Sequence, residues 1–161
     1  MEETQTQYEV EIEGTNFCLL HKYTTASVKD PKPRTIKVKD SSNFLDEWKR
    51  GTYLNEKGNV VIPALNLMAC LFDGAKGMKI GKKALTRIIY TSLVVRPFEP
   101  EVLIKGEKGL EPITLETIKE NDWLNISGVV IKGNRVDRAR TSLPIGWTLK
   151  FQIVAKENTL G

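Results

Sequence analysis

The chain has 161 residues, of which 40% are hydrophobic and 27% are charged, with 12 glycines and 7 prolines. These values fit one globular domain with a single core, and they exclude collagen-like and low-complexity proteins. The longest uncharged runs, residues 59–72 and 88–95, are shorter than the roughly 18 apolar residues of a membrane span. Because the first residues are acidic and lack an apolar signal core, we expect a soluble cytoplasmic protein without a membrane partner.

Few residues are suited to catalysis or to metal binding. Cys18, Cys70 and His21 are the only cysteines and histidine, whereas a structural zinc site usually takes four such ligands. On one strand Cys18 and His21 would point to opposite faces, and no nucleophile motif surrounds them. We therefore predict no catalytic residue, no metal and no cofactor; a nuclease with a carboxylate-bound metal is the enzymatic alternative. Cys70 is expected in the core, and both thiols are expected to be reduced.

The net charge of +4 is unevenly distributed along the chain. Residues 1–13 hold five glutamates and no base, and residues 99–122 hold seven acids against three lysines. Residues 22–39 hold six bases and one acid, 76–96 six bases and no acid, and 132–140 four bases and one acid. This segregation favours one basic face that binds a polyanion, and charges scattered over a solvated surface are the alternative.

A strand and a basic insertion are expected near the start of the chain. Residues 8–13 alternate between apolar residues and glutamates, which predicts a half-buried strand with an acidic outer face. Residues 24–42 are long, polar and basic and contain Pro31 and Pro33, so we expect a flexible basic insertion. Within it, Ile36-Lys37-Val38-Lys39 has the alternation of a β-ribbon.

Apolar residues at helical spacing predict helices at 43–50, 63–72 and 81–93. A hairpin is expected between 52–54 and 59–62. In the third helix, Lys83 and Arg87 should lie one turn apart on the polar side. The residues expected to pack these helices on the sheet are Leu65, Met68, Leu71, Leu85, Ile88 and Ile89.

The last third of the chain is rich in strand patterns. We expect strands at 102–104, 123–132, 135–141 and 147–154, and a brief helix capped by Thr114. The order of elements predicts one α+β domain over residues 1–161, with a mainly antiparallel sheet and helices on one face.

Two basic features suggest contacts to phosphate. Residues 73–83 contain three glycines and four lysines before a helix but lack the P-loop spacing, so we expect a backbone contact without hydrolysis, or simply a linker between helices. Arg138 and Arg140 would share one face of a strand, where they need an anionic ligand or glutamates from a neighbouring strand such as 9–13. Bases could stack on whichever of the neighbouring aromatic residues are exposed, namely Tyr23, Trp48, Tyr53 and Tyr90.

Three stretches also show a resemblance. They are Gly14 followed by Leu19-Leu20-His21, the run from Tyr53-Leu54 through Gly58-Asn59 to Ile62-Pro63, and Arg135-Val136-Asp137-Arg138-Ala139-Arg140 followed by Trp147-Thr148-Leu149-Lys150-Phe151. Together they resemble a widespread, poorly characterised group of phage-encoded proteins. The second run is also similar to the RAMP superfamily of CRISPR backbone proteins, although residues 63–67 lack that family's glycine-serine pair. The resemblance implies an RRM-like or ferredoxin-like core that grips a nucleic-acid backbone.

These observations predict a non-enzymatic, phage-encoded protein of the host cytoplasm that binds the phosphate backbone of single-stranded DNA or RNA. The expected contacts are Lys32, Arg34, Lys37, Lys39, Lys79, Lys82, Lys83, Arg87, Arg138 and Arg140. The alternative is a counter-defence inhibitor that binds a host defence protein or sequesters a nucleotide signal, with the same bases lining a pocket at a homodimer interface. The choice between DNA and RNA and the oligomeric state are left open.

Overall fold

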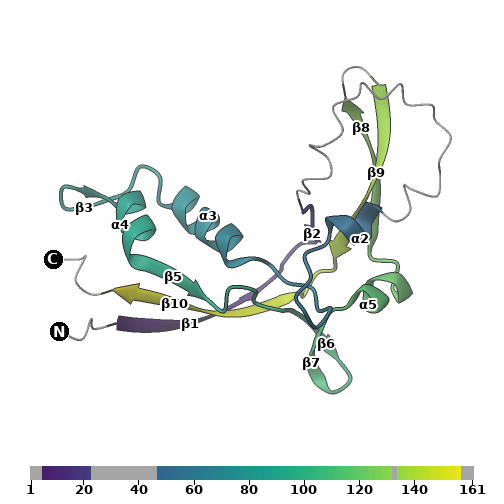
Figure 1. Cartoon of the computed structure of the whole chain (residues 1–161), viewed down its shortest axis with the longest axis horizontal. Coiled ribbons are helices and arrows are strands. Elements are labelled where there is room, and N and C mark those ends of the chain that lie inside the picture. Colours follow the sequence, from purple (N-terminus) through teal and green to yellow (C-terminus); the bar gives the residue numbers. More distant parts are fainter. Residues whose placement is uncertain (1–4, 23–46, 132–133, 157–161) are drawn as a thin grey trace.

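The computed structural model describes residues 5–22, 47–131 and 134–156 (Figure 1). Within these ranges the chain is an α+β protein with four short helices and only antiparallel strand pairs, as predicted for the class. In chain order the elements are β1 (Gln5–Glu13), β2 (Cys18–Leu19), α2 (Glu47–Gly51), α3 (Ala64–Gly74), β3 (Lys79–Ile80), β4 (Lys83–Ala84), α4 (Leu85–Ser92), β5 (Leu93–Arg96), β6 (Val102–Gly106), β7 (Gly109–Pro112), α5 (Leu115–Glu120), β8 (Leu124–Ile131), β9 (Asn134–Leu143) and β10 (Thr148–Lys156).

The main sheet is built around β10. β1 pairs with one edge of β10 along its whole length, from Gln5 opposite Lys156 to Glu13 opposite Thr148. The other edge of β10 pairs first with β6 and then with β5, and β6 continues into a hairpin with β7. The prediction that one mainly antiparallel sheet contains both the first and the last strand is therefore confirmed, and the structure adds that these two strands pair with each other.

One face of this sheet is apolar and the other is charged, because side chains alternate along each strand. Val10 and Ile12 lie opposite Phe151 and Leu149 on the apolar face, which α3 and α4 cover (Figure 1). The glutamates of β1 lie on the opposite face, as the sequence pattern predicts.

The second sheet is a long hairpin of β8 and β9, to which β2 adds a short third strand. Figure 1 shows this hairpin rising away from the main sheet at the end opposite to β3, β4 and α4. The two sheets share a core whose fully buried members include Leu143 of β9 and Leu149 of β10. Thr114 caps α5 by accepting a hydrogen bond from the Thr117 backbone N–H, and Ile113 and Ile118 are both fully buried, as expected for a capped helix with a hydrophobic staple.

The structure corrects three local expectations. Leu65 is 81% exposed, because the packed stripe of α3 runs through Ala64, Met68, Leu71 and Ala75 and Leu65 lies one position off it. Cys70 is likewise exposed and does not belong to the core. The expected hairpin at 52–62 is present in a short form, in which the antiparallel Leu54–Val60 bridge is flanked by two backbone hydrogen bonds and the Asn55 side-chain oxygen holds the turn.

The third predicted helix begins four residues later than expected. Residues 79–84 form a small hairpin, so Lys83 lies on a strand and α4 starts at Leu85. Ile88 and Ile89 are buried, as predicted, and the chain is already extended from Leu93. Among the described residues, no helix is long and apolar enough to cross a membrane.

Candidate nucleic-acid interface

The β3–β4 hairpin presents lysines at the start of α4. Ile80 pairs with Lys83, which leaves Gly81 and Lys82 as a two-residue turn. Gly81 has φ of 58°, the conformation that this position of a type II′ hairpin turn requires. The Leu85 backbone N–H closes the hairpin by donating to the Met78 carbonyl at 3.0 Å. The short turn therefore projects Lys79, Lys82 and Lys83 into solvent.

The electrostatic environment of this hairpin is strongly basic. Residues 74–98 contain six bases and no acid. Lys76 forms an ion pair with Asp73 at 2.7 Å, but no acidic side chain of the described residues pairs with Lys79, Lys82 or Arg87. Unpaired exposed cations of this kind attract an anionic chain and release its condensed counterions when it binds.

Exposed aromatic rings accompany the bases. Tyr90 is 81% exposed and lies one turn after Arg87 on α4. Phe98 is 61% exposed, and the Arg96 guanidinium lies 4.4 Å from its ring centroid. Of the other aromatic residues considered for stacking, Trp48 is buried, and Lys22 lies over the half-buried ring of Tyr53. Tyr90 is thus the ring best placed to stack on a base beside the basic hairpin.

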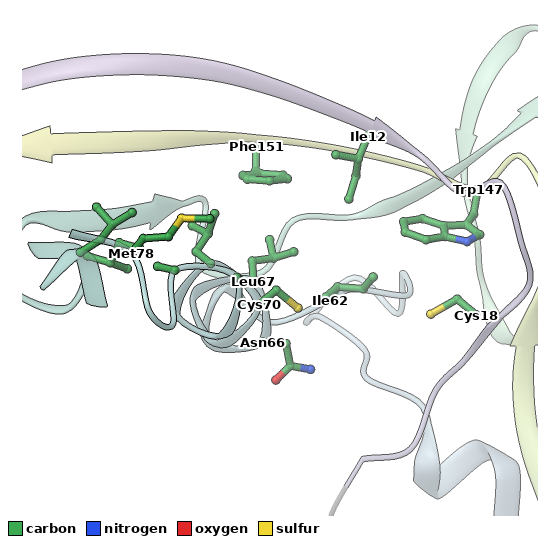
Figure 2. Close-up of a pocket in the computed structure, with 14 residues that line it drawn as sticks. Ile12, Cys18, Ile62, Asn66, Leu67, Cys70, Met78, Trp147 and Phe151 are labelled. Carbon is green, nitrogen blue, oxygen red and sulfur yellow. The ribbon is translucent and has the colours of Figure 1, made fainter. Parts of the chain in front are cut away.

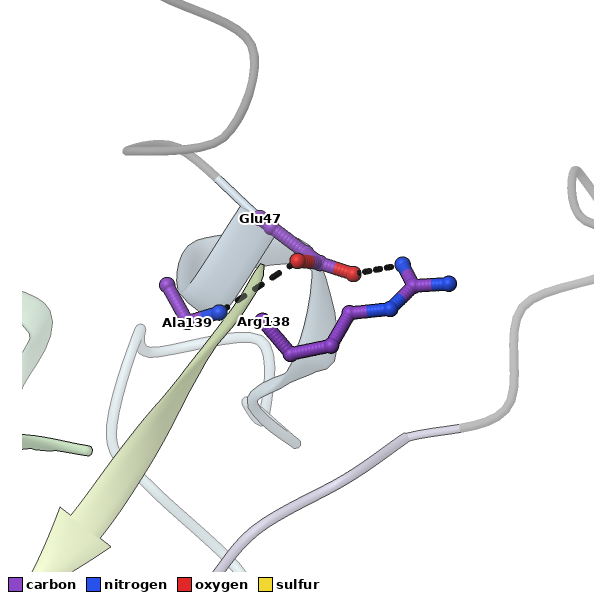
Figure 3. A network of polar contacts seen from close by, with 3 residues as sticks. All are labelled: Glu47, Arg138 and Ala139. Atoms are coloured by element: carbon purple, nitrogen blue, oxygen red, sulfur yellow. Dashed lines mark hydrogen bonds and ion pairs between the residues drawn. The ribbon is translucent and has the colours of Figure 1, made fainter. Parts of the chain in front are cut away.

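Arg138 and Arg140 lie elsewhere and in a different environment. Figure 3 shows the Arg138 guanidinium bound to Glu47 of α2, whose second carboxylate oxygen accepts the Ala139 backbone N–H at 3.3 Å. The Arg140 Nε atom is buried and has no hydrogen-bond partner among the described residues. The strand that carries both arginines lies at the opposite end of the molecule from the hairpin (Figure 1), so the structure does not gather all described candidates on one face. Four further candidates, Lys32, Arg34, Lys37 and Lys39, lie outside the described residues.

Sequence reasoning missed an apolar groove between α3 and the main sheet. The groove has a volume of about 650 Å³, and Figure 2 shows Leu67 and Cys70 of α3 facing Phe151 and Ile12 of the sheet across it. Its lining is apolar apart from Asn66. The one available signal was that α3 carries apolar residues around most of its circumference, more than one packed face needs.

Both cysteines line this groove. Burial raises the pKa of the Cys18 thiol above its ordinary value, which makes it a weaker nucleophile at neutral pH. No group of three or more His, Cys, Asp or Glu residues in the described ranges could hold a metal ion. The groove therefore offers apolar contact, and its lining resembles neither a catalytic centre nor a metal centre.

Comparison of the chain with protein-family models, with curated proteins and with solved structures finds no match.

Proposed function

We propose that this protein is a non-enzymatic protein that binds single-stranded nucleic acid through its phosphate backbone, and that the β3–β4 hairpin with the start of α4 is the binding surface. The observation that carries the proposal is the set of exposed bases on this one element, Lys79, Lys82, Lys83 and Arg87, within a segment of 25 residues, 74–98, that has no acid. A hairpin with a tight turn extends its side chains away from the rest of the molecule, where they can contact the flexible phosphate backbone of a single strand.

Binding of this kind is driven by the release of counterions from the phosphates. Each phosphate neutralised on a single strand lowers log K by roughly 0.7 for each tenfold rise in salt concentration. Lysines act as point charges in such contacts, whereas Arg87 can donate two hydrogen bonds to one phosphate. Because phosphate contacts carry no sequence information, we expect similar affinity for different sequences, with Tyr90 available to stack on any base.

An RRM-like or ferredoxin-like core belongs to the same proposal. What supports it is the placement of α3 and α4 on one face of the β1–β10–β5 sheet, with the other face open. The described residues of that open face include Glu9, Glu11 and Glu13 and no aromatic ring, so we assign the nucleic acid to the hairpin and not to the sheet.

The alternative of a protein that sequesters a nucleotide signal finds less support in the described residues. A nucleotide pocket needs polar groups that fix the base and the phosphates. The apolar groove offers the Asn66 side chain alone for this purpose. A smaller polar pocket of about 310 Å³ has Arg96 and Lys156 to meet a phosphate, but no aromatic ring lines it to hold a base.

A triple substitution tests the proposed surface. Lys79→Ala, Lys82→Ala and Arg87→Ala together should weaken binding to oligonucleotides of about 20 nucleotides, and should reduce the salt slope by up to about 2 units. The matched control is Lys105→Ala, Lys108→Ala and Lys119→Ala, which removes three exposed cations from the acidic stretch of the chain.

Fluorescence anisotropy with single-stranded DNA and RNA, between about 50 and 200 mM salt, measures both variants. Circular dichroism verifies that each variant is folded. Equal losses of affinity in the hairpin variant and in the control would show that binding reflects net charge alone. A hairpin variant with unchanged affinity and salt slope would overturn the proposal.

A further inference from the structure

β1 is the end strand of the main sheet and has one edge without a partner among the described strands. Its other edge pairs with β10 over all nine residues. Just beyond the strand, Gly14 donates its backbone N–H to the Trp147 carbonyl at 2.7 Å, which continues the same register. Residues two apart in an antiparallel pair repeat this orientation, so the backbone groups of Val10 and Ile12 face β10, and those of Glu9 and Glu11 face the open edge.

The two faces of β1 specify the chemistry of a further strand. Tyr8, Val10 and Ile12 lie on the face that the helices cover, and Tyr8 is 57% exposed. Glu9, Glu11 and Glu13 lie on the other face, and all three are exposed. A strand added beside β1 would therefore meet apolar side chains on one face and carboxylates on the other.

β10 already shows which sequence pattern β1 accepts. On the covered face, Phe151 of β10 lies opposite Val10. On the charged face, Lys150 lies 3.2 Å from Glu11, and Gln152 donates a hydrogen bond to Glu9. Apolar residues that alternate with basic or amide residues thus complement β1 along its paired edge.

The apolar groove adjoins the same side of the sheet. Ile12, on the edge strand itself, lines the groove together with Leu67 of α3 (Figure 2). Side chains of an added strand that point to the helix-covered face would lie next to Ile12, between the sheet and α3, where they gain apolar contact.

We propose that the free edge of β1 is a docking site for an extended protein segment in which apolar residues alternate with lysines or arginines, and that this segment binds as an additional strand of the main sheet. Backbone hydrogen bonds would supply affinity, and the alternating side chains would supply specificity. A second β1 does not fit, because the glutamates of two copies would share one face and repel each other. A nucleic-acid strand is disfavoured by the same three carboxylates.

The sequence of the chain supplies a probe with the required pattern. Residues 34–40 read Arg-Thr-Ile-Lys-Val-Lys-Asp, in which isoleucine and valine alternate with two lysines. A labelled synthetic peptide of this sequence is compared with a control peptide of the same composition. In the control peptide the two lysines are next to each other and the isoleucine is next to the valine, so that the alternation is lost. Both are titrated into the full-length chain and into a Lys37→Glu, Lys39→Glu variant, whose own segment no longer complements β1.

We expect the alternating peptide to bind about tenfold more tightly than the rearranged one, because only the former places both lysines opposite carboxylates. Tighter binding to the Lys37→Glu, Lys39→Glu variant than to the unmodified chain would identify the chain's own segment, in the same or a second copy, as an occupant of the edge. Analytical ultracentrifugation of the unmodified chain then shows whether the segment binds within one copy, which leaves a monomer, or in a second copy, which gives a dimer. No binding to either protein would overturn the proposal.

Amide hydrogen exchange separates strand addition from unspecific attraction. The Glu9 and Glu11 amides should gain protection on binding, whereas the Val10 and Ile12 amides are already bonded to β10. Glu9→Lys with Glu13→Lys should abolish binding while sparing the Glu11–Lys150 ion pair, and should create affinity for a peptide with glutamates in place of the two lysines. The control Glu116→Lys with Glu120→Lys makes the same charge change on α5 and should leave binding intact. Binding without new protection at Glu9 and Glu11, or equal loss in the control, would overturn the proposal.

Discussion

Thr52 and Thr141 are joined by a hydrogen bond of 2.7 Å between their hydroxyl oxygens, and both residues are buried. Thr52 Oγ1 also lies 2.7 Å from the backbone carbonyl oxygen of Trp48, which can only accept. Thr52 has one hydroxyl proton and donates it to Trp48, so Thr141 donates to Thr52. These two hydrogen bonds tie the end of α2 to the C-terminal part of β9, since Thr141 lies 89 residues after Thr52 in the chain.

The direction of these two hydrogen bonds predicts unequal effects of two substitutions. Thr52→Val removes both hydrogen bonds and leaves the buried Thr141 hydroxyl without a partner, so the free energy of unfolding should fall by about 1–3 kcal/mol. Thr141→Val removes one bond and keeps the donation to Trp48, so the loss should be about 1 kcal/mol. Urea unfolding measures both. Because the variants share a bond, the double variant should lose less than the sum, and equal single losses would contradict the donor assignment.

Glu47 stabilises β9 by binding the Ala139 backbone N–H, and its ion pair with Arg138 keeps that guanidinium from binding phosphate. Arg138→Ala should lower the free energy of unfolding by about 1 kcal/mol or less, because the side chains of Arg138 and Glu47 are 37% and 26% exposed and solvent weakens their attraction. The loss should shrink as salt concentration rises. If Glu47 holds Arg138 in solution, the salt slope of nucleic-acid binding should be unchanged in this variant. A reduced slope would show instead that Arg138 contacts phosphate, as the sequence suggested.

The first strand of the main sheet could be predicted because its sequence period is unambiguous. Tyr8 to Glu13 alternate over six residues, and a sheet with one buried face leaves such a strand a single orientation. The β3–β4 hairpin could not be predicted in this way, since two residues per strand show no period. The helical spacing of Leu85, Ile88 and Ile89 therefore predicts a helix that also covers the hairpin residues, where the structure has two short strands.

Contacts between residues far apart in the chain could not be predicted from the sequence. Arg138 was expected beside phosphate or a neighbouring strand, but its partner Glu47 lies 91 residues away on a helix. The groove depends on the separation of α3 from the sheet, which no local pattern encodes. Free cysteines are usually buried, which predicts Cys70 in the core, whereas in the structure this residue borders an open groove.

Gly14 is expected to tolerate no side chain. A Cβ atom at this position would lie 1.9 Å from Nε1 of Trp147, whose indole N–H donates to the Asn16 carbonyl at 3.1 Å. Gly14→Ala must therefore displace the indole from the place where β1 ends and the groove begins, at a cost of roughly 1–3 kcal/mol of unfolding free energy. Gly74→Ala is the matched control, since nothing lies within 4 Å of its Cβ position. Similar unfolding midpoints in urea for both variants would contradict this packing.

The two thiols that line the groove should differ in reactivity. Cys70 is exposed, whereas Cys18 is half-buried and its burial raises the pKa of the thiol. Because the thiolate is the reactive form, Cys70 should react with a disulfide reagent about tenfold faster than Cys18 at neutral pH. Raising the pH should accelerate Cys18 over a more alkaline range than an ordinary thiol, since its proton is held more tightly. The variants Cys18→Ser and Cys70→Ser assign each rate to one residue. Equal rates in the two single-thiol proteins, or a Cys18 profile that matches a free thiol, would show that the groove is wider and wetter at Cys18 than the structure describes.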